Sequence, residues 1–362
     1  MSHATRRRFI KLAGSGLLIA HNPHLLAQPP KKKIGVALLG LGNYSANLLA
    51  PALQHTKHCE LRGIITGSEG KIPQWQAKYA IKDANVYTYE TMHNIADNDE
   101  IDVIYVVTPT GTHKDFAVKA ANTGKHVWCE KPMAMDEAEC LEIIHACNKN
   151  KVQLAIGYRM QHEPNTRAFH QYLDTMPYGQ FTGLSSFAGY AGRGGEANYW
   201  RMQKHMGGGA LYDMGVYAIN GARFLTGKEP VTVTGTQPEK RFPNKFTEVD
   251  ETTLFTMDFG DGLVADCGTS VVEGFNYLQA DCENGWYKLS PMQSYSGVTG
   301  TTSDGKRLPP IEGMQQTLQM DNDALAILTG RKPMVTGSEG LADIRIVNAI
   351  FKAAETGDTV ML

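Results

Sequence analysis

Hydrophobic residues follow two different patterns along the chain, and the change between them falls near residue 160. From Lys33 to about residue 158, short continuous apolar runs alternate with stretches of helical periodicity. Continuous apolar runs are typical of parallel strands that are covered on both faces. The fold class expected here is α/β, with a doubly wound, Rossmann-type parallel sheet. The expected strands are Ile34–Leu39, Leu61–Ile65, Ile101–Val107, Lys125–Cys129 and Val152–Ile156, and the expected helices are Ser45–His55, Lys114–Asn122 and Asp136–Asn148.

After residue 160, apolar and polar residues alternate, which is typical of strands with one buried face. This pattern predicts an α+β domain with a large, mostly antiparallel open sheet. Two helices near the C-terminus are expected to pack back on the first domain. We therefore predict a dinucleotide-binding domain at 33–158 and a substrate-binding and oligomerisation domain at 159–362. The strands expected in the second domain are Phe181–Tyr190, Val231–Thr236, Glu251–Phe259, Leu263–Val271 and Tyr277–Cys282, and its terminal helices are Asp323–Thr329 and Leu341–Ala354.

Residues 1–27 have the pattern of an export signal. Arg6 and Arg7 lie in a basic segment, which is followed by a short apolar run and then by Ala27 as a small residue at the expected cleavage site. The adjacent arginines predict the twin-arginine pathway, which exports folded proteins, and hence a periplasmic location. The apolar run is too short and too rich in glycine to cross about 30 Å of hydrocarbon. We expect no membrane association after processing.

Composition and charge narrow the class of protein. The chain has 362 residues, 42% of them hydrophobic and 20% charged, with a formal net charge of −2. This composition predicts a globular protein of roughly two domains, without the basic excess of a nucleic-acid-binding protein. The six cysteines form no C-x-x-C pair and have no metal-ligand spacing with histidine, so we expect mostly buried free thiols and no metal site.

A glycine-rich turn follows the first strand. Gly40-Leu41-Gly42-Asn43-Tyr44-Ser45 connects that strand to a helix, which is the context of the dinucleotide fingerprint. Gly40 allows the tight turn, and Gly42 lets backbone N–H groups approach a pyrophosphate. Ser45 takes the place of the third glycine and is still small enough for close packing of helix and strand.

The end of the second strand bears on the choice between NAD and NADP. An NAD site usually has an acidic residue here for the ribose hydroxyls. This chain has Thr66, Ser68 and Lys71, whose hydroxyls and cation suit a 2′-phosphate. We therefore expect NADP as the cofactor. Glu69 leaves NAD as the less favoured alternative, because an inward-facing carboxylate would favour it.

Polar residues follow two further strands, where open α/β sheets bind their ligands. Glu130-Lys131-Pro132 ends one strand, and Thr108-Pro109 ends another, just before His113. If these side chains are functional, we expect them to contact the cofactor. The alternatives are a surface ion pair for Glu130 and Lys131, and a bond to nearby backbone for His113.

A second polar cluster lies in the second domain. Gly207-Gly208-Gly209 precede a helix on which Asp213 and Tyr217, four residues apart, share one face. Such a pair below a glycine loop suits a site, although a Tyr–Asp hydrogen bond that only stabilises the helix is an equal alternative. Trp200-Arg201, just upstream, has the chemistry to stack on a ring and bind phosphate, or else to pack.

These motifs, with Gly157-Tyr158-Arg159, resemble the glucose–fructose oxidoreductase, inositol dehydrogenase and rhizopine-catabolism (Gfo/Idh/MocA) family from about Lys33 onward, and most closely the glucose–fructose oxidoreductases. The resemblance implies an NADP-containing enzyme that oxidises an aldose at C1 and reduces a second sugar without releasing the cofactor. It implies Lys131 as the group on the reacting hydroxyl, Tyr217 as acid/base and Asp213 as the residue that orients the substrate. Tyr287 is expected as a substrate contact. The expected cofactor contacts are Gly40, Gly42, Asn43, Tyr44, Thr66, Ser68, Lys71, Thr108, Pro109, His113, Glu130, Lys131, Arg159, Trp200 and Arg201.

Two further expectations come with the resemblance. The type enzymes have a long proline-rich arm before the first strand that covers a neighbour's cofactor, whereas only Gln28 to Lys33 occupy that place here. An exchangeable cofactor, as in a conventional sugar dehydrogenase, is therefore an alternative, as are a nicotinamide-dependent glycoside hydrolase and a non-catalytic sugar sensor. We expect Lys131 to lower the pKa of Tyr217. We also expect a homodimer or homotetramer that pairs through the open face of the second sheet.

Overall fold

The computed structural model describes residues 33–362, apart from 193, 194 and 197. The expected twin-arginine signal and its cleavage site lie outside the described residues. Within this described part, no helix has both the length and the apolar character needed to cross a membrane. All six cysteines are free; Cys282 is half-buried and the other five are buried, as expected.

The first domain contains the predicted parallel sheet, with the strand order β3-β2-β1-β4-β5-β6. Its central strand, β1, is apolar and fully buried at every position, because helices cover both faces of the sheet. The order reverses beside β1, since β2 and β4 are its two neighbours. Ligands of open α/β sheets bind outside the carboxyl ends of the strands at such a reversal. The strands are β1 Ile34–Leu39, β2 Cys59–Ile65, β3 Val86–Tyr87, β4 Val103–Val106, β5 His126–Cys129 and β6 Leu154–Ile156.

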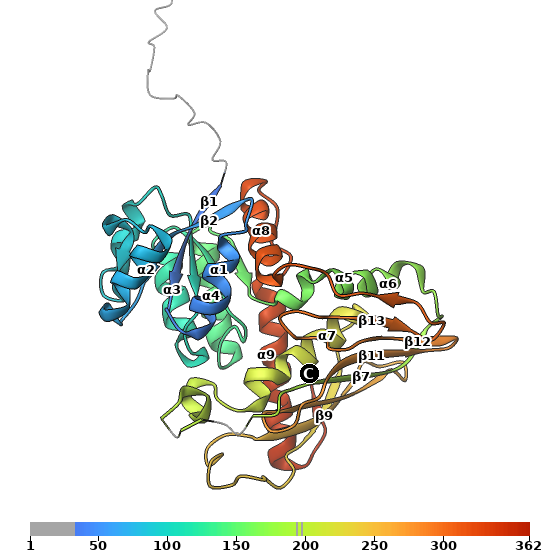
Figure 1. Cartoon of the computed structure of the whole chain (residues 1–362). Helices are drawn as coiled ribbons and strands as arrows, with labels where there is room; N and C mark the ends of the chain where they lie inside the picture. Colours follow the sequence, from blue (N-terminus) through green and yellow to red (C-terminus); the bar gives the residue numbers. More distant parts are fainter. Residues whose placement is uncertain (1–32, 193–194, 197) are drawn as a thin grey trace, which may run out of the picture. The chain divides into compact units, whose positions relative to one another are not determined.

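Helices from both ends of the chain cover this sheet (Figure 1). α3 (His113–Asn122) and α4 (Glu137–Lys149) pack on one face, where α4 also contacts the long C-terminal helix α9 (Gly337–Thr356). α1 (Ala50–Leu53) and α2 (Ile72–Tyr79) lie on the other face. They share it with α8 (Gln315–Leu328), whose Met320 and Ala324 belong to the apolar core there. The C-terminal segment therefore completes the packing of the first domain.

The second domain contains a sheet with the order β14-β13-β12-β11-β7-β10-β9-β8-β15, and this sheet is mostly antiparallel. Its neighbouring strands are antiparallel except β7 and β10, which run parallel at the centre. The sequence patterns identified β7 to β11 and did not identify β12 to β15. The strands are β7 Phe181–Gly189, β8 Thr232–Thr236, β9 Thr252–Asp258, β10 Val264–Ser270, β11 Asn276–Cys282, β12 Gly285–Leu289, β13 Gly300–Thr302, β14 Arg307–Leu308 and β15 Val360–Met361.

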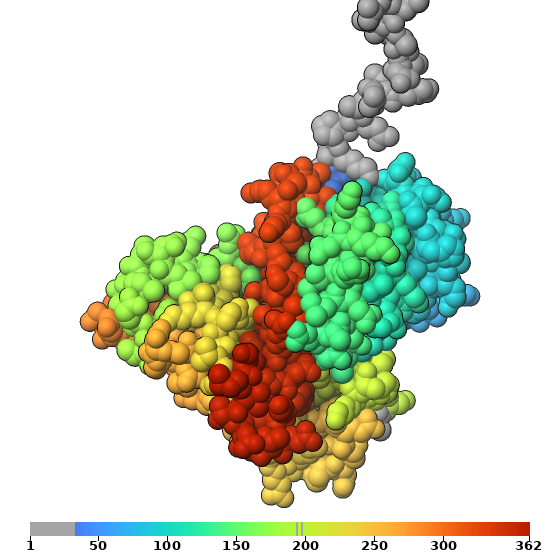
Figure 2. Space-filling view, turned by 180° about the vertical axis from the view of Figure 1, so that it is seen from behind, coloured from blue at the N-terminus to red at the C-terminus, as the bar shows by residue number. Residues whose placement is uncertain are grey.

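Helices α5 (Pro164–His170), α6 (Tyr172–Thr175) and α7 (Val216–Thr226) belong to the second domain, and α7 packs on β7, β10 and β11. In the space-filling view the red C-terminal segment runs between the green residues of the first domain and the yellow and orange residues of the second (Figure 2). α9 therefore joins the two domains by contacting α4 on one side and α7 on the other.

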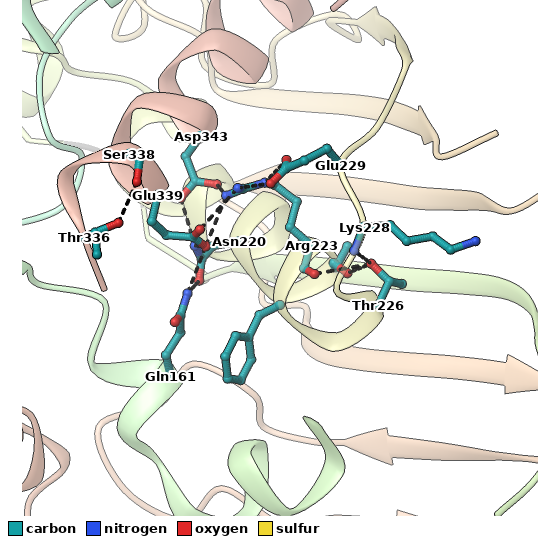
Figure 3. A network of polar contacts seen from close by, with 12 residues as sticks. Gln161, Asn220, Arg223, Thr226, Lys228, Glu229, Thr336, Ser338, Glu339 and Asp343 are labelled. Atoms are coloured by element: carbon teal, nitrogen blue, oxygen red, sulfur yellow. Dashed lines mark hydrogen bonds and ion pairs between the residues drawn. The ribbon is translucent and has the colours of Figure 1, made fainter. Parts of the chain in front are cut away.

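A buried polar network connects α7 to α9 (Figure 3). The Arg223 guanidinium on α7 donates to Asp343 at 2.5 Å and to Glu339 at 3.2 Å, both on α9. Asn220 donates to the other oxygen of Asp343 at 2.9 Å, and Gln161 donates to Asn220 and Glu339. Burial raises the pKa of Asp343 to about 6, although the Arg223 charge acts in the opposite direction. The network fixes the helix that carries Tyr217 to the C-terminal helix.

Candidate active site

A cavity of about 1030 Å³ lies at the carboxyl ends of β1, β2, β4 and β5 and extends to the start of α7. Both domains contribute to its wall. The residues of the first domain include the fingerprint turn and the Glu130-Lys131-Pro132 segment, and those of the second include Asp213 and Tyr217. The cavity thus brings together every side chain expected at the cofactor and every expected catalytic side chain.

The fingerprint turn is shaped for a phosphate-bearing ligand. Gly40 has a φ of +96°, and a Cβ there would lie 2.7 Å from the carbonyl oxygen of Val107, so only glycine fits. A Cβ on Gly42 would contact nothing within 4 Å, which leaves room for a ligand against the backbone. Ser45 donates its hydroxyl to the Gly40 carbonyl at 2.5 Å and so holds the turn closed. These residues fit the pyrophosphate of a dinucleotide.

The chain segment after β2 forms one end of the cavity. Thr66, Ser68 and Lys71 line it, and the Lys71 ammonium donates to the Leu41 carbonyl at 2.9 Å. Glu69 is exposed and is not part of the cavity wall. An inward-facing Glu69 carboxylate, which would have favoured NAD, is therefore not found in the described cavity.

Lys131 lies where the two domains meet. Its ammonium donates to the backbone carbonyl of Asp213 at 2.7 Å, and the same nitrogen lies 4.4 Å from the centroid of the Tyr217 ring. Burial lowers the pKa of Lys131, while the Asp213 carboxylate raises it. The structure therefore brings three expected catalytic residues into one cluster.

Asp213 is held by an ion pair. Arg201 donates from Nε to the Asp213 carboxylate at 3.0 Å, and the Tyr190 hydroxyl lies 3.5 Å from the same oxygen. The Arg201 guanidinium carbon also lies 4.2 Å from the centroid of the Trp200 ring. The equal alternative of a Tyr217–Asp213 hydrogen bond is not found among the described contacts. Trp200 and Arg201 both line the cavity, and Arg201 positions Asp213 in addition to any contact with a cofactor.

Tyr217 is buried beneath aromatic and cationic side chains. The Arg159 guanidinium lies 5.2 Å from its ring centroid, and the Tyr158 ring meets it edge-on at 6.4 Å. Burial raises the pKa of Tyr217, Arg159 lowers it, and the Glu130 carboxylate raises it. The expectation of a lowered pKa is wrong, because desolvation prevails over the cationic side chains, among which Arg159 lowers the pKa most. The raised pKa favours the neutral phenol form of Tyr217.

Glu130 lies in the cavity wall, and the alternative of a surface ion pair with Lys131 is not found among the described residues. Its carboxylate accepts a hydrogen bond of 2.5 Å from the Tyr105 hydroxyl, which accepts one of 2.8 Å from Gln319 on α8. Gly157 leaves room for it, because a Cβ there would lie 2.6 Å from Glu130 Oε1. Burial raises the pKa of Glu130 to about 7, while the Tyr105 hydrogen bond lowers it.

Thr108, Pro109 and His113 also reach the cavity wall. The His113 ring is bonded to two backbone carbonyl oxygens, that of Pro132 at 2.8 Å and that of Thr108 at 2.7 Å. The alternative given from the sequence, a histidine bonded to nearby backbone, is therefore found. These bonds fix the loop after β4 to the Glu130-Lys131-Pro132 segment.

The prediction that Tyr287 contacts the substrate is wrong, because this residue does not line the cavity. It is 2% exposed and packs among Phe169, Tyr172 and Tyr178, with ring centroids 5.0, 5.1 and 6.1 Å away. Its strand, β12, was not identified from the sequence, so the direction of this side chain could not be deduced. It belongs to the core of the second domain.

Several residues that line the cavity were not predicted from the sequence. Tyr89 lies beyond the second strand, Tyr190 directly follows β7, and Tyr295 lies in the loop after β12 with its ring centroid 4.5 Å from the Arg159 guanidinium. For Tyr190, the strand-end rule applied to the second domain would have given a signal. Gly192 and Gly195, which follow β7, and Gln293–Ser296, which follow β12, also line the cavity.

Comparison with known proteins agrees with this geometry. The model of an oxidoreductase family with an NAD-binding Rossmann fold matches residues 34–158, and the model of the GFO/IDH/MocA C-terminal domain matches residues 167–288. A D-xylose 1-dehydrogenase (NADP+) of Haloarcula marismortui is 27% identical over 338 residues, which are 90% of this chain and 92% of that protein. An inositol 2-dehydrogenase of Rhizobium meliloti is 28% identical over 288 residues, 76% of this chain and 86% of that protein. The crystal structure of an aldose–aldose oxidoreductase of Caulobacter crescentus matches with a TM-score of 0.87 at 34% identity, over 91% of this chain and 100% of that one.

Proposed function

The chain belongs to the Gfo/Idh/MocA family and is an NAD(P)-dependent oxidoreductase acting on sugars; within that class, we propose that it oxidises an aldose at C1 with NADP and reduces a second sugar with the same bound cofactor. The observation that carries this proposal is the cluster of Lys131, Asp213 and Tyr217 in the cavity that also contains the fingerprint turn. The similarity to an aldose–aldose oxidoreductase supports the choice of two aldoses as partners of the reaction.

Each residue of this cluster would have a separate role in the proposed reaction. Asp213, fixed by Arg201, accepts hydrogen bonds from sugar hydroxyls and so orients the ring. Lys131 donates to the reacting oxygen and stabilises the negative charge that develops there. Tyr217 donates and accepts a proton at the same oxygen, as general acid/base catalysis requires. Bound nicotinamide would supply the acceptor for the hydride that leaves C1.

NADP is preferred over NAD in this proposal. Thr66, Ser68 and Lys71 offer hydroxyls and an ammonium to a 2′-phosphate, and Glu69 is exposed and is not part of the cavity wall. A charge-assisted hydrogen bond from Lys71 to that phosphate would contribute about 1.5–3 kcal/mol. The D-xylose dehydrogenase relatives named for NADP agree with this choice.

The test uses protein purified from the periplasm without added nucleotide. It is denatured to identify any released nucleotide, and the native protein is separately given glucose and fructose, or two aldoses, with no cofactor. NADP in near-stoichiometric amount, with lactone and sugar alcohol both formed, would support the closed cycle. An empty protein that oxidises aldoses only with added NADP would be a conventional dehydrogenase, and an enzyme inactive on every aldose would contradict the proposal.

Export and assembly belong to the same proposal. The twin-arginine pattern at Arg6-Arg7 supports export of the folded protein to the periplasm. The open face of the second sheet carries Leu254 and Val264, which are 39% and 40% exposed, and the stacked rings of Phe187 and Tyr277. Such a face supports a homodimer or homotetramer that pairs through the sheet. Light scattering that gives a monomer mass would contradict this assembly.

A further inference from the structure

Glu130 has an unusual environment for a carboxylate beside a cationic cluster. It is 7% exposed, it lines the cavity, and its hydrogen-bond partner is the neutral Tyr105 hydroxyl. None of the ion pairs found in the described part of the chain includes Glu130, although Lys131 is its neighbour in sequence. A buried carboxylate without a paired cation is costly in its ionised form. Such a group gains stability when it takes up a proton.

Two features support the position of Glu130. Tyr105 on β4 donates to Glu130 and accepts from Gln319 on α8, so the C-terminal segment reaches the cavity through this chain. Gly157 leaves the space that the carboxylate occupies. The carboxylate of Glu130 is therefore buried and held in a fixed position in the cavity wall.

Tyr217 exchanges the proton at the sugar oxygen in the proposed reaction, and the reaction also needs a final acceptor for that proton. Oxidation of a sugar hydroxyl releases one proton from the oxygen. Burial raises the pKa of Tyr217 and favours its neutral phenol, and a neutral phenol takes that proton only if it passes its own proton to another group. Lys131, as an ammonium, has the same limitation.

We propose that Glu130 is the proton acceptor of sugar oxidation and holds the proton until a second sugar is reduced; this rests on the proposed function. In the first step the sugar O–H bond breaks, and its proton passes through the polar groups of the cavity to form an O–H bond on the Glu130 carboxylate. The C1–H electron pair leaves as hydride, for which bound oxidised nicotinamide would supply the two-electron acceptor, and C1 and its oxygen form the lactone carbonyl. Reduction of the second sugar returns both the hydride and the proton, so the closed cycle is neutral overall.

The surroundings of Glu130 set the pH at which it acts. Burial raises its pKa to about 7, and the Tyr105 hydrogen bond, Lys131 and Arg159 lower it. Glu130 must be ionised to accept a proton, so sugar oxidation should fall as the pH drops through about 7. The titratable and charged groups that face it are Tyr44, Tyr105, Cys129, Lys131, Arg159, Tyr217 and Tyr295.

The test measures the pH profile of single-turnover aldose oxidation in the NADP-loaded full-length enzyme. Glu130→Gln keeps the shape and an acceptor for Tyr105, and it should lower the rate by about 100-fold or more at pH 8 and remove the acid limb. Tyr105→Phe removes a hydrogen bond that lowers the Glu130 pKa, so it should move the acid limb to higher pH. Tyr87→Phe, which also removes a buried tyrosine hydroxyl but lies outside the cavity, is the control and should leave the profile unchanged.

A second measurement does not depend on turnover. Infrared titration of the protein without sugar should show a protonated carboxyl band that disappears near pH 7 and is missing from Glu130→Gln. The other buried acids are common to both proteins and cancel in the difference. An unchanged acid limb in Glu130→Gln, or a difference spectrum without this band, would overturn the inference. If the wild type oxidises no aldose, the proposed function fails instead, and the infrared difference still reports whether Glu130 titrates.

Discussion

The Lys131 ammonium nitrogen lies 4.4 Å from the centroid of the Tyr217 ring, and the two residues come from different domains. Lys131 follows β5 of the parallel sheet, whereas Tyr217 lies at the start of α7 beside the second sheet. The ammonium is fixed in this place because it donates to the Asp213 carbonyl. The proposed catalytic cluster therefore exists only when both domains are folded and joined.

Lys131→Met tests the lysine as the group on the reacting oxygen. Methionine keeps much of the side-chain volume and removes the charge, so aldose oxidation should fall by at least about 100-fold while nucleotide stays bound. Single-turnover rates and the nucleotide content of the purified variant check this. Lys149→Met, on the exposed surface of α4, is the matched control. Normal turnover in Lys131→Met would remove this residue from the mechanism.

Tyr217→Phe tests the acid/base assignment. Loss of the hydroxyl should lower kcat by about 100- to 10,000-fold and change KM much less, because the ring still packs against Tyr158. Tyr287→Phe is the comparison, since Tyr287 lies in the aromatic core outside the cavity and should keep wild-type kcat/KM. A larger loss in Tyr287→Phe than in Tyr217→Phe would reverse both assignments.

The fold and the ligand-binding edge could be predicted from sequence because they depend on local patterns. The apolar run of β1 and the turn from Gly40 to Ser45 are continuous in sequence, and so is the segment that ends at Lys131. The contacts that set the chemistry are not local. Gln319 and Tyr105 are 214 residues apart, so the support of Glu130 from α8 has no sequence pattern.

The pKa shift of Tyr217 could not be predicted from sequence for the same reason, because it depends on non-local contacts. The prediction that Lys131 lowers it used one neighbour in isolation, whereas burial by residues from several elements prevails in the folded protein. The prediction that Tyr287 contacts the substrate failed for a different reason. β12 is only five residues long, and no pattern distinguished which of its side chains faces the core.

Lys71→Ala tests the preference for NADP. Loss of the ammonium should weaken NADP binding by about 10- to 100-fold and leave NAD binding nearly unchanged, because only NADP carries the 2′-phosphate. Calorimetric titration with both nucleotides gives the ratio. Glu69→Ala is the control, since Glu69 is exposed outside the cavity wall and should change neither affinity. A gain in NADP affinity in Glu69→Ala would show that the carboxylate faces the nucleotide after all.

Arg223→Met tests whether the network between α7 and α9 holds the helix of Tyr217 in place. The variant leaves Asp343, which is fully buried, without its cation, and should lose about 3–5 kcal/mol of unfolding free energy at pH 8. Burial raises the pKa of Asp343 to about 6 in the wild type, and removing Arg223 raises it further. A raised carboxyl pKa means that the folded state binds the extra proton, so stability falls as pH rises through that range. The loss should therefore be smaller at pH 5 than at pH 8.

Denaturant unfolding at the two pH values measures this difference. Arg345→Met, which breaks the half-exposed pair with Glu137, is the control and should cost about 0–1 kcal/mol at either pH. The double variant Arg223→Met with Asp343→Asn should recover part of the loss, because no buried unpaired charge remains. An equal loss at both pH values, with no recovery in the double variant, would mean that Arg223 acts through packing rather than through the charge of Asp343.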